Sequence, residues 1–206
     1  AAPTYTMTSS GTAGSAPTGS SMFIKVVAVS ITTVSISGTS DGNDGATVKV
    51  AFNSTVQPQS GVIDTGTWSI TGLTEPSVTD VVTVWVDNVA DNLESTAVTL
   101  YLSSPVSGLV LNTNTLSLGN DQDQSLSLTN LDTYDCTQDE DIMHQAASDQ
   151  LKVEGDACAG STTNSYTSEK ISILSGDTLT LGTSETITTY DLENAGTITV
   201  TGNGTL

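Results

Sequence analysis

The segments Val81-Val-Thr-Val-Trp-Val86 and Ala97-Val-Thr-Leu-Tyr-Leu102, joined by the polar run Asp87 to Ser95, decide the fold class of this chain. One face of each segment carries valine and leucine, and the other carries threonine and an aromatic residue. This alternation is the two-residue period of a pleated strand. We therefore expect two neighbouring strands at the centre of a β-sandwich.

Length and composition favour an all-β protein with two domains. The chain has 206 residues, of which 4% are aromatic. A chain of this length can bury one large core or two small ones, and we expect two. The predicted divisions are an extended N-terminal tail at residues 1–31, a β-sandwich at residues 32–104 and a second β domain at residues 105–206, with the boundary in Ser103-Ser-Pro-Val-Ser-Gly108.

The charge balance disfavours several classes of partner. The chain carries 23 Asp and Glu residues against four Lys and Arg, for a formal net charge of -19. Nucleic-acid binding depends on basic side chains that neutralise phosphates, so no nucleic-acid partner is expected. An anionic membrane surface is disfavoured for the same reason. We also expect no membrane span, because the most apolar run, Met22 to Ile31, is only about ten residues long and contains Lys25.

The N-terminal residues and two glycosylation sequons indicate where in or outside the cell the protein is expected. The chain begins Ala1-Ala2-Pro3 without methionine, which is typical of a protein whose signal peptide has been removed, and we expect it to be extracellular or at the cell surface. Asn53 and Asn203 lie in Asn-x-Ser/Thr sequons and are glycosylation candidates, so glycans are a further expected partner. Serine and threonine are so frequent here that sequons also arise by chance.

A family resemblance covers residues 34 to 102. Ser35-Ile-Ser-Gly-Thr39 is followed by a glycine-rich turn and by Gly45-Ala-Thr-Val-Lys-Val50. Next come Asp64-Thr-Gly-Thr-Trp-Ser-Ile-Thr-Gly-Leu73 and the closing hairpin. This order is similar to the carboxypeptidase-regulatory-like or transthyretin-like sandwich, a seven-stranded Ig-like Greek-key module. The resemblance implies a noncatalytic spacer or binding domain of a secreted protein, and it supplies no catalytic residues.

The last part of the chain reads as short strands separated by turns. Ile171 to Ile173, Thr178 to Leu181, Glu185 to Leu192 and Gly196 to Val200 resemble the opening rungs of β-helical or β-solenoid surface proteins. A further β segment is expected in Leu126 to Leu131. Together with Leu128-Thr-Asn-Leu-Asp-Thr-Tyr-Asp135, this order of elements is similar to large secreted β-repeat proteins of bacterial cell surfaces. Two rungs are too few for a solenoid that is stable alone, so a second small β-sandwich is an equal alternative.

No recognisable catalytic site is assembled by the sequence. The single histidine, His144, lies in the only short helical candidate, Asp139 to Ser148, and we interpret it as a packing or solvated residue. Carboxylate pairs for glycoside hydrolysis are disfavoured, because most acids lie in turn-rich segments where solvation keeps them ionised and few aromatic residues are present to stack on sugars. We expect no enzyme activity.

The two cysteines, Cys136 and Cys158, are expected to form a disulfide. A zinc site would need more thiols or histidines at short spacing, and an exported chain favours oxidation. The bond would close a loop around an acidic segment that has little apolar material of its own.

That segment suggests calcium as the one possible cofactor, since excess oxygen ligands suit this ion. No EF-hand pattern is present, and a solvated acidic loop is the alternative. The candidate metal ligands are Asp121, Asp123, Asp132, Asp135, Asp139 and Asp141.

We interpret the chain as a noncatalytic extracellular subunit that assembles with copies of itself into a pilus-like filament or a layer. Residues 1–31 are expected to add as a strand to a sheet edge of a neighbouring copy, because an unpaired apolar strand would otherwise aggregate. The alternative is an adhesin or carbohydrate-binding module. The candidate assembly residues are Tyr5, Met7, Met22, Phe23, Ile24, Val26, Val27 and Val29.

Overall fold

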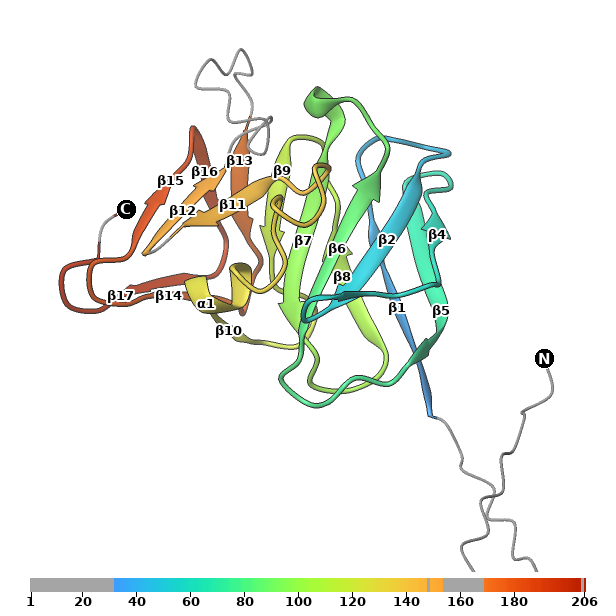
Figure 1. Ribbon diagram of the computed structural model, residues 1–206, viewed down its shortest axis with the longest axis horizontal. Coiled ribbons are helices and arrows are strands. Elements are labelled where there is room, and N and C mark those ends of the chain that lie inside the picture. Colours follow the sequence, from blue (N-terminus) through green and yellow to red (C-terminus); the bar gives the residue numbers. More distant parts are fainter. Residues whose placement is uncertain (1–31, 148, 154–168, 205) are drawn as a thin grey trace, which may run out of the picture. The chain divides into compact units, whose positions relative to one another are not determined.

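The computed structural model describes residues 32–147, 149–153, 169–204 and 206. These residues form an all-β structure with four sheets and very little helix (Figure 1). None of the helices in this described part is long and apolar enough to cross a membrane. The predicted tail at residues 1–31 lies outside the described residues, so its role as an assembly strand stays a prediction.

The first core lies between two sheets, as the sequence predicted for a sandwich. One sheet has the order β5-β1-β8, and it faces the strands β2, β6 and β7 of an eight-stranded sheet. The hairpin of β6 and β7 expected from the sequence is confirmed as an antiparallel pair. The bounds are β1 (Thr33–Thr39), β5 (Thr67–Thr74), β8 (Val106–Val110), β2 (Thr47–Phe52), β6 (Val81–Asp87), β7 (Ser95–Leu100) and the short edge strands β3 (Thr55–Val56) and β4 (Gly61–Val62).

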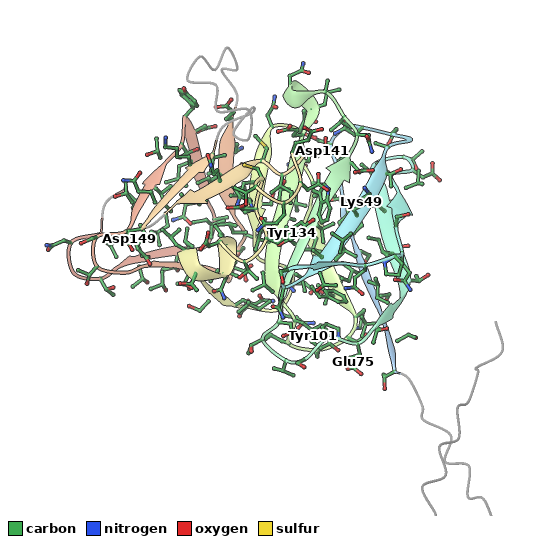
Figure 2. The ribbon with its side chains drawn as sticks, in the orientation of Figure 1. Lys49, Glu75, Tyr101, Tyr134, Asp141 and Asp149 are labelled. Atoms are coloured by element: carbon green, nitrogen blue, oxygen red, sulfur yellow. The ribbon has the colours of Figure 1, made fainter. Side chains whose placement is uncertain are left out.

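Strand β6 is buried on both faces. Val82, Val84 and Val86 point into the first core and are fully buried. On the opposite face Trp85 is also fully buried, and its ring centroid lies 5.3 Å from that of Tyr134. Figure 2 shows Tyr134 in front of the central strands. The segment that follows the short helix α1 (Leu128–Leu131) therefore covers the outer face of the sheet.

In the second half of the chain the backbone winds so that each strand pairs in parallel with a strand of the next turn. We call this arrangement the parallel coil, and each turn of it a rung. Successive strands stack in register on three sheets, in the orders β9-β13-β16, β10-β14-β17 and β12-β15. Strand β11 (His144–Ala147) forms a hairpin with β12. The coil strands are β9 (Thr115–Leu118), β10 (Ser125–Ser127), β12 (Gln150–Val153), β13 (Lys170–Ile173), β14 (Thr178–Leu181), β15 (Thr186–Thr188), β16 (Asp191–Asn194) and β17 (Thr197–Val200).

Alternation along each coil strand explains why the coil has a core. Ile171 and Ile173 of β13 are fully buried and are separated by Ser172, which is only partly buried. Leu179 and Leu181 of β14 follow the same pattern around Thr180. Inward side chains of one strand stack on those of the next strand in parallel register, so each additional rung extends one continuous apolar core.

The two halves share one sheet. Strand β7 pairs in parallel with β9, with Ser95 opposite Thr115 and Val98 opposite Leu118. The eight-stranded sheet therefore runs across the position where the sequence predicts a domain boundary, between residues 104 and 105 (Figure 1). Residues 31–206 form one compact unit.

Two local predictions are wrong. Leu126 to Leu131 is not a single strand: β10 ends at Ser127, and Leu128–Leu131 is helical. Ser127 and Asn130 form a capping box there, which satisfies free N–H groups at the helix start. The expected helix around His144 is instead the strand β11, because residues 144–147 pair in antiparallel register with residues 150–153.

We predict that Leu118→Ala lowers the free energy of unfolding by about 2–5 kcal/mol, because a fully buried side chain is replaced by a cavity. Chemical denaturation with two spectroscopic probes measures this change. Leu93→Ala is the matched control, since Leu93 is 40% exposed. Equal losses in the two variants would contradict the burial of β9 at the junction of the two halves.

Candidate functional site

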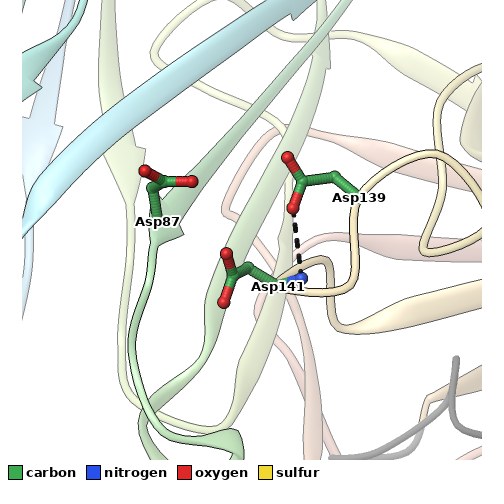
Figure 3. A group of neighbouring side chains, drawn as sticks. All are labelled: Asp87, Asp139 and Asp141. Carbon is green, nitrogen blue, oxygen red and sulfur yellow. Dashed lines mark hydrogen bonds between the residues drawn. The ribbon is translucent and has the colours of Figure 1, made fainter.

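Three carboxylates meet at one end of strand β6. Asp87, Asp139 and Asp141 each place a carboxylate oxygen within 4.8 Å of those of the other two (Figure 3). Asp87 is the last residue of β6, and the other two lie in the loop between α1 and β11. The packing of Tyr134 and Ile142 against Trp85 holds this loop over the sheet, and so brings the carboxylates together.

Backbone and side-chain hydrogen bonds fix the orientation of the cluster. The Asn88 backbone N–H donates to Asp141 Oδ2 at 2.9 Å, and the Asp141 backbone N–H donates to Asp139 Oδ1 at 3.2 Å. Asn88 Nδ2 donates to Asp87 Oδ2 at 2.6 Å. Each bond leaves carboxylate lone pairs available, because an ionised carboxylate offers about four acceptor positions.

The cluster carries more negative than positive charge. Lys49 Nζ lies 2.7 Å from Asp87 Oδ1, and this hydrogen bond raises the pKa of Lys49. Burial raises the pKa of Asp141, with the charges of Asp139 and Asp87 adding to the effect and the Asn88 hydrogen bond opposing it. Three carboxylates and one ammonium leave two net negative charges. A half-buried group of oxygen ligands with that charge suits a divalent cation such as calcium.

The cluster contains two of the six predicted metal ligands. The sequence identified Asp139 and Asp141 by the density of acids around them, but it did not identify Asp87, which lies more than fifty residues earlier at the end of a strand. Asp132 is exposed and lies outside this cluster. Asp135 is buried, and its Oδ1 accepts hydrogen bonds from the backbone and hydroxyl of Thr137.

Asp121 and Asp123 lie in the turn between β9 and β10, beside a third carboxylate that the sequence did not single out. Asp177 is fully buried, and its Oδ1 accepts the Gln124 backbone N–H at 3.0 Å. Its other oxygen, Oδ2, is also buried. The Asp177 carboxyl fills the space where a side chain at Gly119 would stand, so a glycine is required there. Burial raises the pKa of Asp177 to about 6; interactions with the Gln124 and Asn120 backbones oppose this effect, and the charges of Asp123 and Asp121 add to it.

The remaining predicted residues are placed as follows. Cys136 is buried, whereas Cys158 lies outside the described residues, so the disulfide stays a prediction.

The Asn53 side chain forms hydrogen bonds with both the Asp80 side chain and the Val81 backbone N–H, and Asn203 is exposed in a turn. His144 is fully buried, which lowers its pKa to about 4 and keeps it neutral at pH 7.

The described aromatic side chains are mostly inside the molecule. Phe52, Trp68, Trp85, Tyr101 and Tyr134 are all buried, and Tyr190 is 65% exposed. A planar surface for stacking on sugars would need several exposed aromatic rings. The described part of the chain offers one.

Comparison of the chain with protein-family models, with curated proteins and with solved structures finds no match.

We predict that calcium raises the melting temperature and that Asp141→Asn and Asp139→Asn each abolish most of the increase. Binding to the folded state alone stabilises it by about 2.7 kcal/mol when the ion is at 100 times its Kd. Thermal melts in chelator and in millimolar calcium measure the effect. Asp132→Asn removes the same charge from an exposed position outside the cluster and should keep the increase. No calcium response in the unmodified protein would reject the site.

We predict that Asp177→Asn flattens the dependence of stability on pH. The pKa of Asp177 is raised to about 6 in the folded state, so its contribution to stability is complete below the unfolded-state pKa and is lost as pH rises through about 6. Asparagine keeps an acceptor for the Gln124 N–H and has no charge to bury. Denaturation series from pH 4 to pH 7 should show a smaller loss of stability in the variant than in the unmodified protein. Parallel curves would contradict the prediction.

Proposed function

We propose that this protein is a noncatalytic structural subunit of an extracellular filament or layer, and that copies of it join by adding a strand to an open sheet edge. The observation that carries the proposal is that the rung formed by β16 and β17 is only partly covered among the described residues. Each of these strands pairs on one side only among the described residues.

The inward positions of this rung are only partly covered. Leu192 stacks on Ile171, and Val200 stacks on Leu181, in parallel register. Ile171 and Leu181 are fully buried, whereas Leu192 is 37% exposed and Val200 is 42% exposed. Apolar side chains next to unpaired backbone N–H and C=O groups form a surface that favours the addition of another strand.

The finer fold that we propose is an Ig-like or transthyretin-like sandwich followed by a β-solenoid-like unit. The two-sheet packing around the first core supports the sandwich. Parallel stacking on three successive sheets supports a solenoid rather than a second small sandwich, since a sandwich has two facing sheets. The pairing of β7 with β9 offers a reason why so few rungs are stable. Strand β9, in the first rung, adds to the sheet that β7 and β6 already form in the sandwich, so the coil does not begin at an open edge.

The alternative function, an adhesin or carbohydrate-binding module, receives less support. A binding module would present an exposed aromatic surface. Among the described residues that surface is limited to Tyr190, which lies beside the open rung itself. We therefore propose self-assembly with copies of the same chain as the main role.

We predict that deletion of residues 1–31 abolishes assembly while the described fold is retained. Electron microscopy and size-exclusion chromatography of the full chain and the truncated chain measure assembly, and circular dichroism checks the fold. The described strands form four sheets by pairing with one another, so the truncated chain should stay folded. Filaments or oligomers that persist without residues 1–31 would show that the tail is not the joint.

A further inference from the structure

We propose that β16 is the acceptor edge, and that Met22–Ile31 of a second copy pairs with it so that Lys25 lies beside Asp191 and Glu193. This inference rests on the proposed function, because it names the joint through which copies assemble. The eight-stranded sheet, which ends at β16 within one copy, would then gain one further strand from the neighbouring copy.

The other sheet edges in the described part of the chain are shorter or already covered. Strands β3 and β4 have two residues each, and β10 and β15 have three. The outer edge of β8 is met by the turn before β10, since the Asp121 backbone N–H donates to the Ser107 carbonyl at 3.1 Å. The edge of β11 is met in the same way, by the Cys136 backbone N–H at 3.0 Å from the His144 carbonyl. Strand β5, with eight residues, is the longest edge strand, and its outer side is met by the segment at β4: Gln59 Nε2 donates to the Gly72 carbonyl at 2.9 Å, and Gly61 lies against the Ser69 carbonyl. Among the described edge strands of four or more residues, β16 and β17 are the ones left open.

Charge distinguishes β16 from β17. The outward positions of β16 are Asp191 and Glu193, whereas those of β17 are Thr197 and Thr199. The neighbouring strand β13 already shows how a lysine fits this acidic edge: Lys170 Nζ forms an ion pair with the Glu193 carboxylate. A chain with a net charge of -19 repels its own copies, so a lysine on the donor strand favours β16.

The period of a strand then fixes the register. If Lys25 faces outward beside the acids, the residues on either side of it, Ile24 and Val26, face inward. They would then cover Leu192, which is 37% exposed, and continue the apolar column of Leu116, Ile171 and Leu192. A slip by one residue would turn the lysine ammonium toward the apolar interior of the coil, where a buried, unpaired charge is strongly unfavourable.

Disulfide cross-linking tests the pairing. Chains carrying Lys25→Cys are mixed with chains carrying Glu193→Cys under mild oxidation, and linked dimers are measured on nonreducing gels and by mass spectrometry. We expect dimers linked through positions 25 and 193. Leu192→Cys and Thr199→Cys are the matched acceptor controls, since they test the inward face of β16 and the outward face of β17.

The outcomes separate this inference from the proposed function. Assembly without the link between positions 25 and 193, or with stronger linking to position 199, overturns the choice of β16 and leaves self-assembly standing. Linking within one chain that carries both substitutions, without links in the mixture, overturns the second copy as the occupant. A full-length chain that never assembles rejects both proposals.

Charge reversal gives a second readout. Lys25→Glu should raise the concentration needed for assembly several-fold, because it places a carboxylate beside Asp191 and Glu193. Lys152→Glu makes the same change in net charge on an exposed side chain of β12, and it should have little effect. Equal effects of the two reversals would show that net charge alone controls assembly, and would overturn the specific contact.

Discussion

The burial of both faces of β6 is the constraint on which the rest of the structure depends. A strand with valines on one face and a tryptophan on the other has no side that can face water, so its sheet needs a covering layer on each side. The sheet of β1, β5 and β8 covers the valine face. The segment around Tyr134 covers Trp85, and it comes from the second half of the chain. The two halves are therefore joined through side-chain packing as well as through the pairing of β7 with β9.

The strands that could be predicted from the sequence are those in which apolar and polar residues alternate. The strands β6, β7, β13, β14 and β17 were expected close to their observed bounds, because each alternates apolar and polar residues between turn residues. Leu128–Leu131 was missed, since the capping box of Ser127 and Asn130 outweighs a leucine pattern that fits a strand equally well. The parallel ladder of β7 and β9 could not be predicted from one sequence, because pairing between distant segments leaves no local pattern.

The candidate cation site shows the same limit. The many acidic residues in this stretch of the sequence identified the loop that holds Asp139 and Asp141. A cation, however, is bound by oxygens that lie close together in space, whatever their separation in the sequence. The third carboxylate, Asp87, comes from a strand end, and only the packing of Trp85 against Tyr134 brings it near the loop. Asp177 was overlooked for a similar reason: its burial depends on Gly119 in the preceding rung, which leaves space for the carboxyl.

The scarcity of basic residues has a consequence for resistance to proteolysis. Trypsin-like proteases cleave after lysine and arginine and need several residues around the bond in an extended, unpaired conformation. Lys49, Lys152 and Lys170 each lie in a strand that is paired on both sides, so their backbones are accessible only after local unfolding. The described part of the chain therefore offers such proteases no cleavage site outside a paired strand, and its resistance to digestion is set by the stability of the sheets themselves.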